Sequence, residues 1–176
     1  ILHNWWGNGT TVDYSNGNWA EGLTTYMADY ELAVQKSAKQ GSQMLLTWLR
    51  DYAALPAIRD TPVTGFTSKH DAATQVIGYN KVAFIFHMLK CELGKPVFTK
   101  ALRLFWRRQQ LRTSGWMDLR RAFELASGRD LGWFFKQWLD RAGAPRLYLA
   151  NVRITTRTDG GGYRLGFTVR QDQPTY

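Results

Sequence analysis

The 176-residue chain has few cysteines, few prolines and no long apolar run. Its single cysteine, Cys91, excludes a disulfide within the chain. Because Cys91 stands in an apolar helical stretch, we expect a buried, unreactive thiol, which leaves the compartment open. No run of 18 apolar residues is present, so we expect no membrane-spanning helix. The five prolines serve here only as local markers of helix ends and loops.

Acidic residues are also scarce, and the imbalance is local. The chain has 23 Lys and Arg against 14 Asp and Glu, a net charge of +9. Residues 95–157 have a net charge of +10, whereas residues 1–94 have −1. Such asymmetry is found in nucleic-acid-binding proteins, but no nucleic-acid motif accompanies it. We therefore expect no nucleic-acid partner, and a basic face that is solvated or meets an acidic neighbouring domain.

What the chain has in quantity is apolar and aromatic material at helical spacing. Hydrophobic residues make up 44% of it and aromatic residues 14%, enough for a substantial core. Periodicity, glycine stops and prolines predict a mainly α fold, a multi-helix bundle with a loop at residues 57–70. The expected helices run from Trp19 to Lys39, Gly41 to Ala54, 79 to 93, 97 to 110, 115 to 126 and 130 to 141.

The hydrophobic period changes to two after Pro145. Apolar residues alternate in 148–154 and again in 163–169, with three glycines between them. This predicts a β-hairpin in which Tyr148, Ala150, Val152 and Ile154 share the apolar face. A lone hairpin is marginally stable, so it needs further strands, another copy of the chain, or the helices to cover it. We expect a helical domain at 1–145 and the start of a β-sandwich domain at 146–176.

Two side chains near the start of the chain, those of His3 and Glu21, predict a metal site. Two histidines four residues apart on a helix can share one Zn²⁺, with a glutamate after the first of them beside the water. His3 has the position of the second histidine. Between His3 and Glu21 lie helix-stopping glycines and the Asn16-Gly17 turn, enough chain to bring a second helix back alongside the first. Zinc accepts carboxylate as well as imidazole ligands, which makes Glu21 the other candidate.

These residues resemble those of the aminopeptidase N family of gluzincin zinc metallopeptidases. The family pattern is His-Glu-x-x-His followed by aromatic residues and Gly-Asn, then Glu-Gly 18 residues later; here residues 3–8 read His-Asn-Trp-Trp-Gly-Asn and Glu21 precedes a glycine. The chain departs from the pattern in three ways. The first histidine and the glutamate would stand in the two positions before Ile1, the ligand spacing is one residue short, and Trp19 is two rather than three residues before Glu21.

A second segment is similar to the family's Tyr-x-Lys-Gly helix. Residues 79–82 read Tyr-Asn-Lys-Val, so the resemblance makes Tyr79 the residue that donates a hydrogen bond to the oxyanion. The alternative is that Tyr79 only begins a buried helix as a half-buried wedge. Val82 replaces the usual glycine, which changes packing but removes no functional group.

The resemblance, which also covers residues 126–145, implies the C-terminal lobe of a zincin catalytic domain followed by the first hairpin of a truncated β-sandwich. The intact parent would be a zinc-dependent aminopeptidase acting on peptide substrates, with His3 and Glu21 as zinc ligands. Aminopeptidase and endopeptidase activity, and residue preference, stay open. The fragment would lack its N-terminal half, bind Zn²⁺ weakly or not at all, and be inactive. A noncatalytic helical interaction module, a pseudoenzyme, is the alternative, and a basic nucleic-acid-binding domain is a more distant one.

Overall fold

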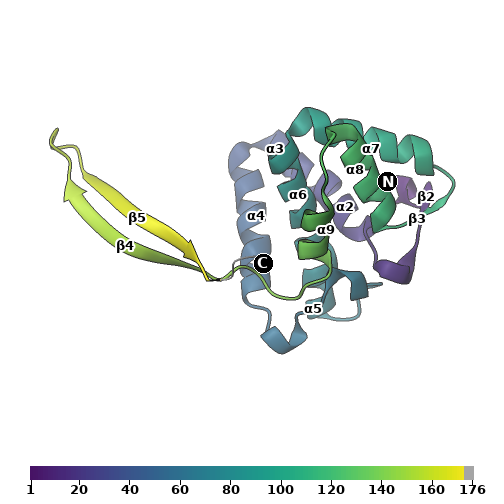
Figure 1. The fold of residues 1–176 in the computed structure, drawn as a ribbon, viewed down its shortest axis with the longest axis horizontal. Coiled ribbons are helices and arrows are strands. Elements are labelled where there is room, and N and C mark those ends of the chain that lie inside the picture. The colour runs from purple at the N-terminus through teal and green to yellow at the C-terminus, as the bar shows by residue number, and fades with distance from the viewer. Residues whose placement is uncertain (173–176) are drawn as a thin grey trace. The chain divides into compact units, whose positions relative to one another are not determined.

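The computed structural model describes residues 1–172 and divides the chain into two compact units, Ile1–Ala142 and Gly143–Tyr176. The first unit is built of helices with a small parallel sheet, and the described part of the second is a β-hairpin (Figure 1). This confirms the prediction of a mainly α chain that ends in a hairpin. The assignment of the second unit to a β-sandwich domain stays a prediction.

Short helical segments join into longer helices in the first unit. Two π-helical stretches, η2 (Tyr26–Tyr30) and η5 (Val76–Lys81), continue the α-helices on either side of them without a break. The α-helices are α1 (Leu2–Trp5), α2 (Ala20–Thr25), α3 (Glu31–Lys36), α4 (Ala38–Ala53), α5 (Ala72–Gln75), α6 (Val82–Leu93), α7 (Lys95–Gln109), α8 (Trp116–Ser127) and α9 (Gly132–Leu139). No helix within residues 1–172 is both long and apolar enough to cross a bilayer.

Two helix boundaries differ from prediction because of side-chain caps. The first predicted helix ends at Lys36, since Ser37 has extended backbone and its hydroxyl accepts a hydrogen bond from the Gln40 amide at 3.1 Å, which starts α4. The helix predicted to begin at residue 79 begins at Ala72. There the Asp71 carboxylate accepts from the Thr74 amide at 2.8 Å in a capping box.

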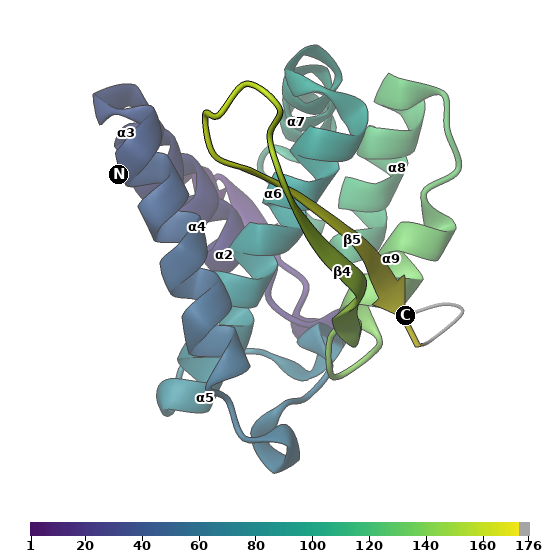
Figure 2. The same ribbon diagram turned by 90° about the vertical axis from the view of Figure 1, so that its left-hand side faces the viewer.

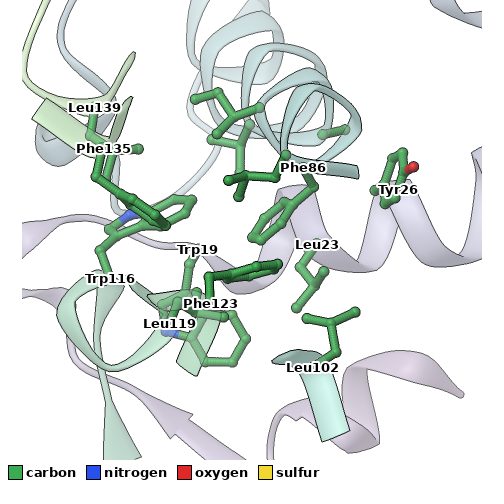
Figure 3. Packing of buried hydrophobic residues seen from close by; sticks show 14 of the residues in the cluster. Trp19, Leu23, Tyr26, Phe86, Leu102, Trp116, Leu119, Phe123, Phe135 and Leu139 are labelled. Atoms are coloured by element: carbon green, nitrogen blue, oxygen red, sulfur yellow. The ribbon is translucent and has the colours of Figure 1, made fainter. Parts of the chain in front are cut away.

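Among residues 1–172, every member of the core cluster belongs to the first unit. Trp19, Phe86 and Phe123 lie close together in Figure 3, with helices far apart in sequence contributing to one cluster. Trp19 meets Phe105 edge to face, with ring centroids 5.1 Å apart. The view in Figure 2 shows α2, α4 and α6 running beside one another. This layer carries the candidate site residues of α2 and of η5.

A small parallel sheet connects the start of the chain to the segment after α7. It consists of β1 (Trp6–Gly7), β2 (Thr10–Val12) and β3 (Thr113–Ser114), in that order. A buried hydrogen bond between the hydroxyls of Thr10 and Ser114, 2.9 Å apart, joins β2 to β3. It fixes the residues that follow His3 against a distant part of the chain.

The hairpin pairs β4 (Leu147–Thr156) with β5 (Tyr163–Gln171) in antiparallel register. The prediction that one apolar face runs through residues 148, 150, 152 and 154 is wrong. A bulge between Ala150 and Arg153 shifts the register, and Asn151 has a φ of 53°. As a result Leu149 stands opposite Val169 before the bulge, while Ile154 stands opposite Leu165 after it.

The thiol is also not where the sequence predicts it. Cys91 is exposed, and its Sγ lies 3.6 Å from Nε2 of His87, one turn earlier on α6. The apolar composition of this stretch was misleading because α6 buries only one of its sides. Ile85, Phe86 and Leu89 lie on that buried side. The expectation of a buried cysteine is therefore wrong.

Candidate active site

His3 and Glu21 lie next to each other although they belong to different helices. Nε2 of His3, on α1, is 3.5 Å from Oε2 of Glu21, on α2. Both side chains reach solvent: His3 is 55% exposed and Glu21 25%. The structure therefore brings the two predicted ligands together, and both side chains remain accessible to water.

The start of α2 is held by two residues immediately before it. The side-chain oxygen of Asn18 accepts a hydrogen bond from the Ala20 amide at 2.9 Å, and its amide nitrogen donates to the Thr67 carbonyl at 3.0 Å. The indole of Trp19, which is fully buried, donates to the Ser114 carbonyl at 2.8 Å. Asn18 is a residue type that commonly begins helices, so the sequence contained a signal for this boundary.

Gly22 explains why a glycine follows the glutamate. A Cβ at this position would lie 2.2 Å from Cγ1 of Val82, so α2 approaches the start of α6 more closely than any side chain at position 22 would permit. Val82 is itself fully buried. The close approach brings Glu21 to η5, which contains Tyr79.

Tyr79 is presented by the π-helical segment η5. Its ring meets that of Phe66 edge to face, with centroids 6.0 Å apart. The preceding residue is a glycine, and a Cβ on Gly78 would lie 2.0 Å from the Phe66 ring. Isolated π-helical turns inside α-helices occur often at functional sites. Phe66, which the sequence did not single out, therefore supports both the backbone and the ring at this position.

The hydroxyl of Tyr79 is protonated at neutral pH. Burial, followed by a hydrogen bond to the Glu21 carboxylate and by the charge of that carboxylate, raises the pKa of Tyr79 to about 12. Tyr79 therefore acts as a hydrogen-bond donor beside Glu21. All three predicted site residues, His3, Glu21 and Tyr79, come together around Glu21, and their roles stay predictions.

A buried polar network next to Tyr79 was missed from the sequence. Nζ of Lys81, a residue only 8% exposed, lies 3.6 Å from a carboxylate oxygen of Asp60 and 3.3 Å from the hydroxyl of Tyr52. Burial lowers the pKa of Lys81, and the Asp60 carboxylate opposes that shift. The Lys81 ammonium also donates to the Arg141 carbonyl at 3.4 Å. Since Asp60 falls in a predicted loop, no local pattern pointed to this pairing.

The donor set fits part of a zinc site. Two ligands at about 2.1 Å from one tetrahedral zinc ion lie about 3.4 Å apart, which matches the separation of the His3 and Glu21 atoms. Within residues 1–172, no group of three or more histidine, cysteine or carboxylate side chains is arranged to hold a metal ion. The described residues therefore fit two coordination positions and leave the others to donors outside this pair.

Comparison with known proteins gives one consistent result. The family described as "Peptidase family M1 domain" matches residues 1–138 of this chain. An aminopeptidase N of Streptomyces lividans is 28% identical over 187 positions, covering 99% of this chain and 21% of that protein. An aminopeptidase N of Caulobacter vibrioides is 30% identical over 164 positions, covering 90% of this chain and 18% of that protein. The chain thus spans about a fifth of the length of these curated relatives.

Solved structures agree with the fold. Aminopeptidase A of Legionella pneumophila, in complex with aspartic acid, superimposes with a TM-score of 0.62 and 26% identity, covering 96% of this chain and 19% of that one. The M1 zinc metallopeptidase of Deinococcus radiodurans gives a TM-score of 0.67 at 22% identity, over 82% of this chain and 32% of that one, which shows the fold alone. Because the family match covers well over half of the sequence, the chain belongs to peptidase family M1, the aminopeptidase N family of zinc metallopeptidases.

Proposed function

We propose that this chain supplies two zinc ligands, His3 and Glu21, and an oxyanion-stabilising residue, Tyr79, to an aminopeptidase that hydrolyses N-terminal peptide bonds. The observation that carries the proposal is the 3.5 Å approach of the His3 and Glu21 donor atoms. The Glu21 carboxylate also contributes to the raised pKa of Tyr79. Membership of the M1 family supports it.

Each residue would act in a different way. The imidazole of His3 and the carboxylate of Glu21 would hold the metal between them. When bound, zinc supplies Lewis acidity that polarises the scissile carbonyl and lowers the pKa of water. Tyr79 would donate its hydroxyl proton in a hydrogen bond to the carbonyl oxygen as negative charge develops there. One such donor contributes about 2.7 to 4 kcal/mol to transition-state stabilisation.

On its own the 176-residue chain should not hydrolyse peptides. It provides two donors where catalytic zinc sites have three protein ligands, and it does not contain the glutamate that the family pattern places three positions before His3 to accept the proton of the attacking water. We expect no zinc-dependent cleavage of aminoacyl reporters by the purified chain. We also expect less than stoichiometric zinc after dialysis.

An N-terminal extension tests the ligand assignment directly. Adding Ala-Ala-Ala-His-Glu before Ile1 places a histidine four residues before His3, on the same helical face, and a glutamate after it. We expect the extended chain to bind zinc about 10²-fold more tightly than the original. The gain should disappear when His3→Ala or Glu21→Gln is combined with the extension. The control is an extension of the same length in which Ala-Ala replaces His-Glu.

The results separate the proposal from its alternative. Tighter zinc binding that survives Glu21→Gln would show that Glu21 is not a ligand. No gain from the extension, with the helical content unchanged by circular dichroism, would favour the noncatalytic interaction module. The only observation that favours the noncatalytic module is the number of donors. Within residues 1–172, no third histidine, cysteine or carboxylate joins His3 and Glu21 in an arrangement that could hold a metal ion.

A further inference from the structure

A cleft separate from the His3 and Glu21 pair opens between α7 and the η2–α3 helix. Its volume is about 510 Å³, within the range of about 300–1,000 Å³ that ligand sites occupy. Phe98 and Leu102, both almost fully buried, give it an apolar lining. Trp5 and Trp106 also line it, with ring centroids 4.7 Å apart, and Trp5 is 50% exposed.

Positive charge follows one side of this cleft. Lys95, Arg103 and Arg107 line it from α7, and all three side chains are exposed. None of them has an ion pair among residues 1–172. The cleft has one carboxylate, Glu31, and this group is already paired with Lys90. The cleft therefore combines exposed aromatic surface with an excess of unpaired cations.

The spacing of the cations suits an extended peptide. Arg103 and Arg107 are four residues apart, so they lie on one side of α7 with a rise of about 6 Å between them. Alternate residues of an extended peptide are separated by about 6.6 Å and point the same way. Carboxylates at alternate positions of a peptide could therefore meet successive cations of α7, while a side chain between them faces the tryptophans.

We propose that this cleft binds an acidic peptide segment, with carboxylates against Arg103 and Arg107 and an aromatic side chain against Trp5 and Trp106. Charge complementarity selects an anionic partner. The apolar lining selects a partner with a large apolar side chain, which favours a peptide over a sugar-phosphate chain. The proposal goes beyond the peptidase function and does not depend on zinc.

Fluorescence anisotropy on the 176-residue chain tests the proposal. The probe is a fluorescein-labelled peptide, Glu-Asp-Glu-Tyr-Glu-Asp-Glu, and it is compared with a Tyr-to-Ser version, an all-lysine version with the same tyrosine, and a labelled ten-residue oligothymidylate. We expect the acidic tyrosine peptide to bind most tightly, and its affinity to fall as salt is raised.

Charge-matched variants locate the site. Arg103→Gln with Arg107→Gln should weaken binding about five- to tenfold. The control, Arg108→Gln with Arg112→Gln, removes the same charge from exposed positions outside the cleft lining and should change the affinity less than twofold. Trp5→Ala should weaken binding about three- to tenfold. All five positions are exposed, and unchanged circular dichroism would verify that each variant is folded.

Four results would overturn the proposal. Equal loss in the two double variants would mean that binding follows net charge and not this cleft. Equal affinity for the Tyr-to-Ser peptide would remove the aromatic part of the recognition. Tighter binding of the oligothymidylate, lost in the same cleft variants, would identify a nucleic-acid site instead. Absence of measurable peptide binding at millimolar protein and low salt would also refute it.

Discussion

Glu21 is central to the candidate site because it bears on both other members. Its Oε2 lies 3.5 Å from Nε2 of His3, and its carboxylate helps to raise the pKa of Tyr79. A carboxylate that holds a metal is partly neutralised, so its effect on a neighbouring phenol must weaken. The pKa of Tyr79 therefore reports the state of Glu21, which makes the pair measurable in the chain without any substrate.

We predict that Glu21→Gln lowers the pKa of Tyr79 from about 12, without returning it to 10. The negative carboxylate disfavours the phenolate, so removing it lowers the pKa, while burial, the larger cause, remains. The measurement is an NMR titration of tyrosine labelled with ¹³C at Cζ, with the Tyr79 signal assigned by Tyr79→Phe. Glu31→Gln, which removes a carboxylate beside Tyr26, serves as the control and should leave the Tyr79 titration unchanged. An unaltered value in Glu21→Gln would show that burial alone sets the pKa.

In a zinc-loaded enzyme that contains this chain, the two residues should have separable effects. Glu21→Gln should reduce the zinc content, whereas Tyr79→Phe should keep zinc and lower kcat about 10²- to 10³-fold. The reason is that one side chain holds the metal and the other makes a bond that matters mainly in the transition state. Metal analysis and steady-state kinetics are the measurements, with Tyr14→Phe, at an exposed tyrosine, as control. If kcat is unchanged in Tyr79→Phe, Tyr79 only packs at the start of the helix.

At the scale of elements, the site depends on how closely α2 approaches η5 and α6. Gly22 permits the contact with Val82, and Gly78 permits the contact with Phe66. Lys81 then ties the end of η5 to Asp60 and to the Arg141 carbonyl. The segment that presents Tyr79 is thus fixed on several sides by packing and by buried charge. A change that separates these elements should disturb the site without touching a functional group.

We predict that Gly22→Ala destabilises the chain by about 1–3 kcal/mol, the usual cost of overpacking a tight core. The added Cβ would stand 2.2 Å from Cγ1 and 2.3 Å from Cβ of the fully buried Val82. Urea denaturation followed by circular dichroism measures this. Gly65→Ala is the matched control, because a Cβ there meets no atom within 4 Å. In a Val82→Gly background, which lacks both of the nearest atoms, Cγ1 and Cβ of Val82, the added cost of Gly22→Ala should be smaller; an equal cost there would place the strain elsewhere.

Sequence patterns predicted elements well where one local signal decided them. The helix stop at Gly94 and the hairpin turn at residues 160–162 follow from glycines with positive φ. The patterns failed where a helix cap or a distant partner determined the structure. The helix break at Ser37 depends on a single hydroxyl, and the ion pair of Lys81 with Asp60 joins segments 21 residues apart. The bulge at Asn151 likewise reversed half of the predicted apolar face.

For the candidate site, the family motifs singled out His3, Glu21 and Tyr79 from short local patterns, and the roles of these residues stay predictions. The motifs did not reveal the supporting contacts of Phe66 or of the network around Lys81, since these depend on tertiary approach. The exposure of Cys91 was missed for a related reason: the composition of a stretch does not say which side of a helix is covered.

At the scale of the whole molecule, the division into two units has a simple basis in where apolar side chains are buried. Every member of the core cluster lies between Trp6 and Leu139, so the described residues of the second unit contribute none. The first unit also contains the candidate site and the acidic-peptide cleft. The hairpin has its own backbone pairing between β4 and β5. Folding of the first unit should therefore be determined by residues up to about the end of α9.

We predict that a chain ending at Pro145 keeps the helical circular dichroism signal and unfolds within about 2 °C of the full chain, since it retains the entire core cluster. Thermal unfolding at equal concentration is the measurement. Leu139→Ala, at a buried core position, is the positive control and should lower Tm by about 8 °C or more, because such truncations cost about 2–5 kcal/mol. A drop in the shortened chain as large as that of Leu139→Ala would mean that residues 146–176 stabilise the helical unit, and that the two units fold as one.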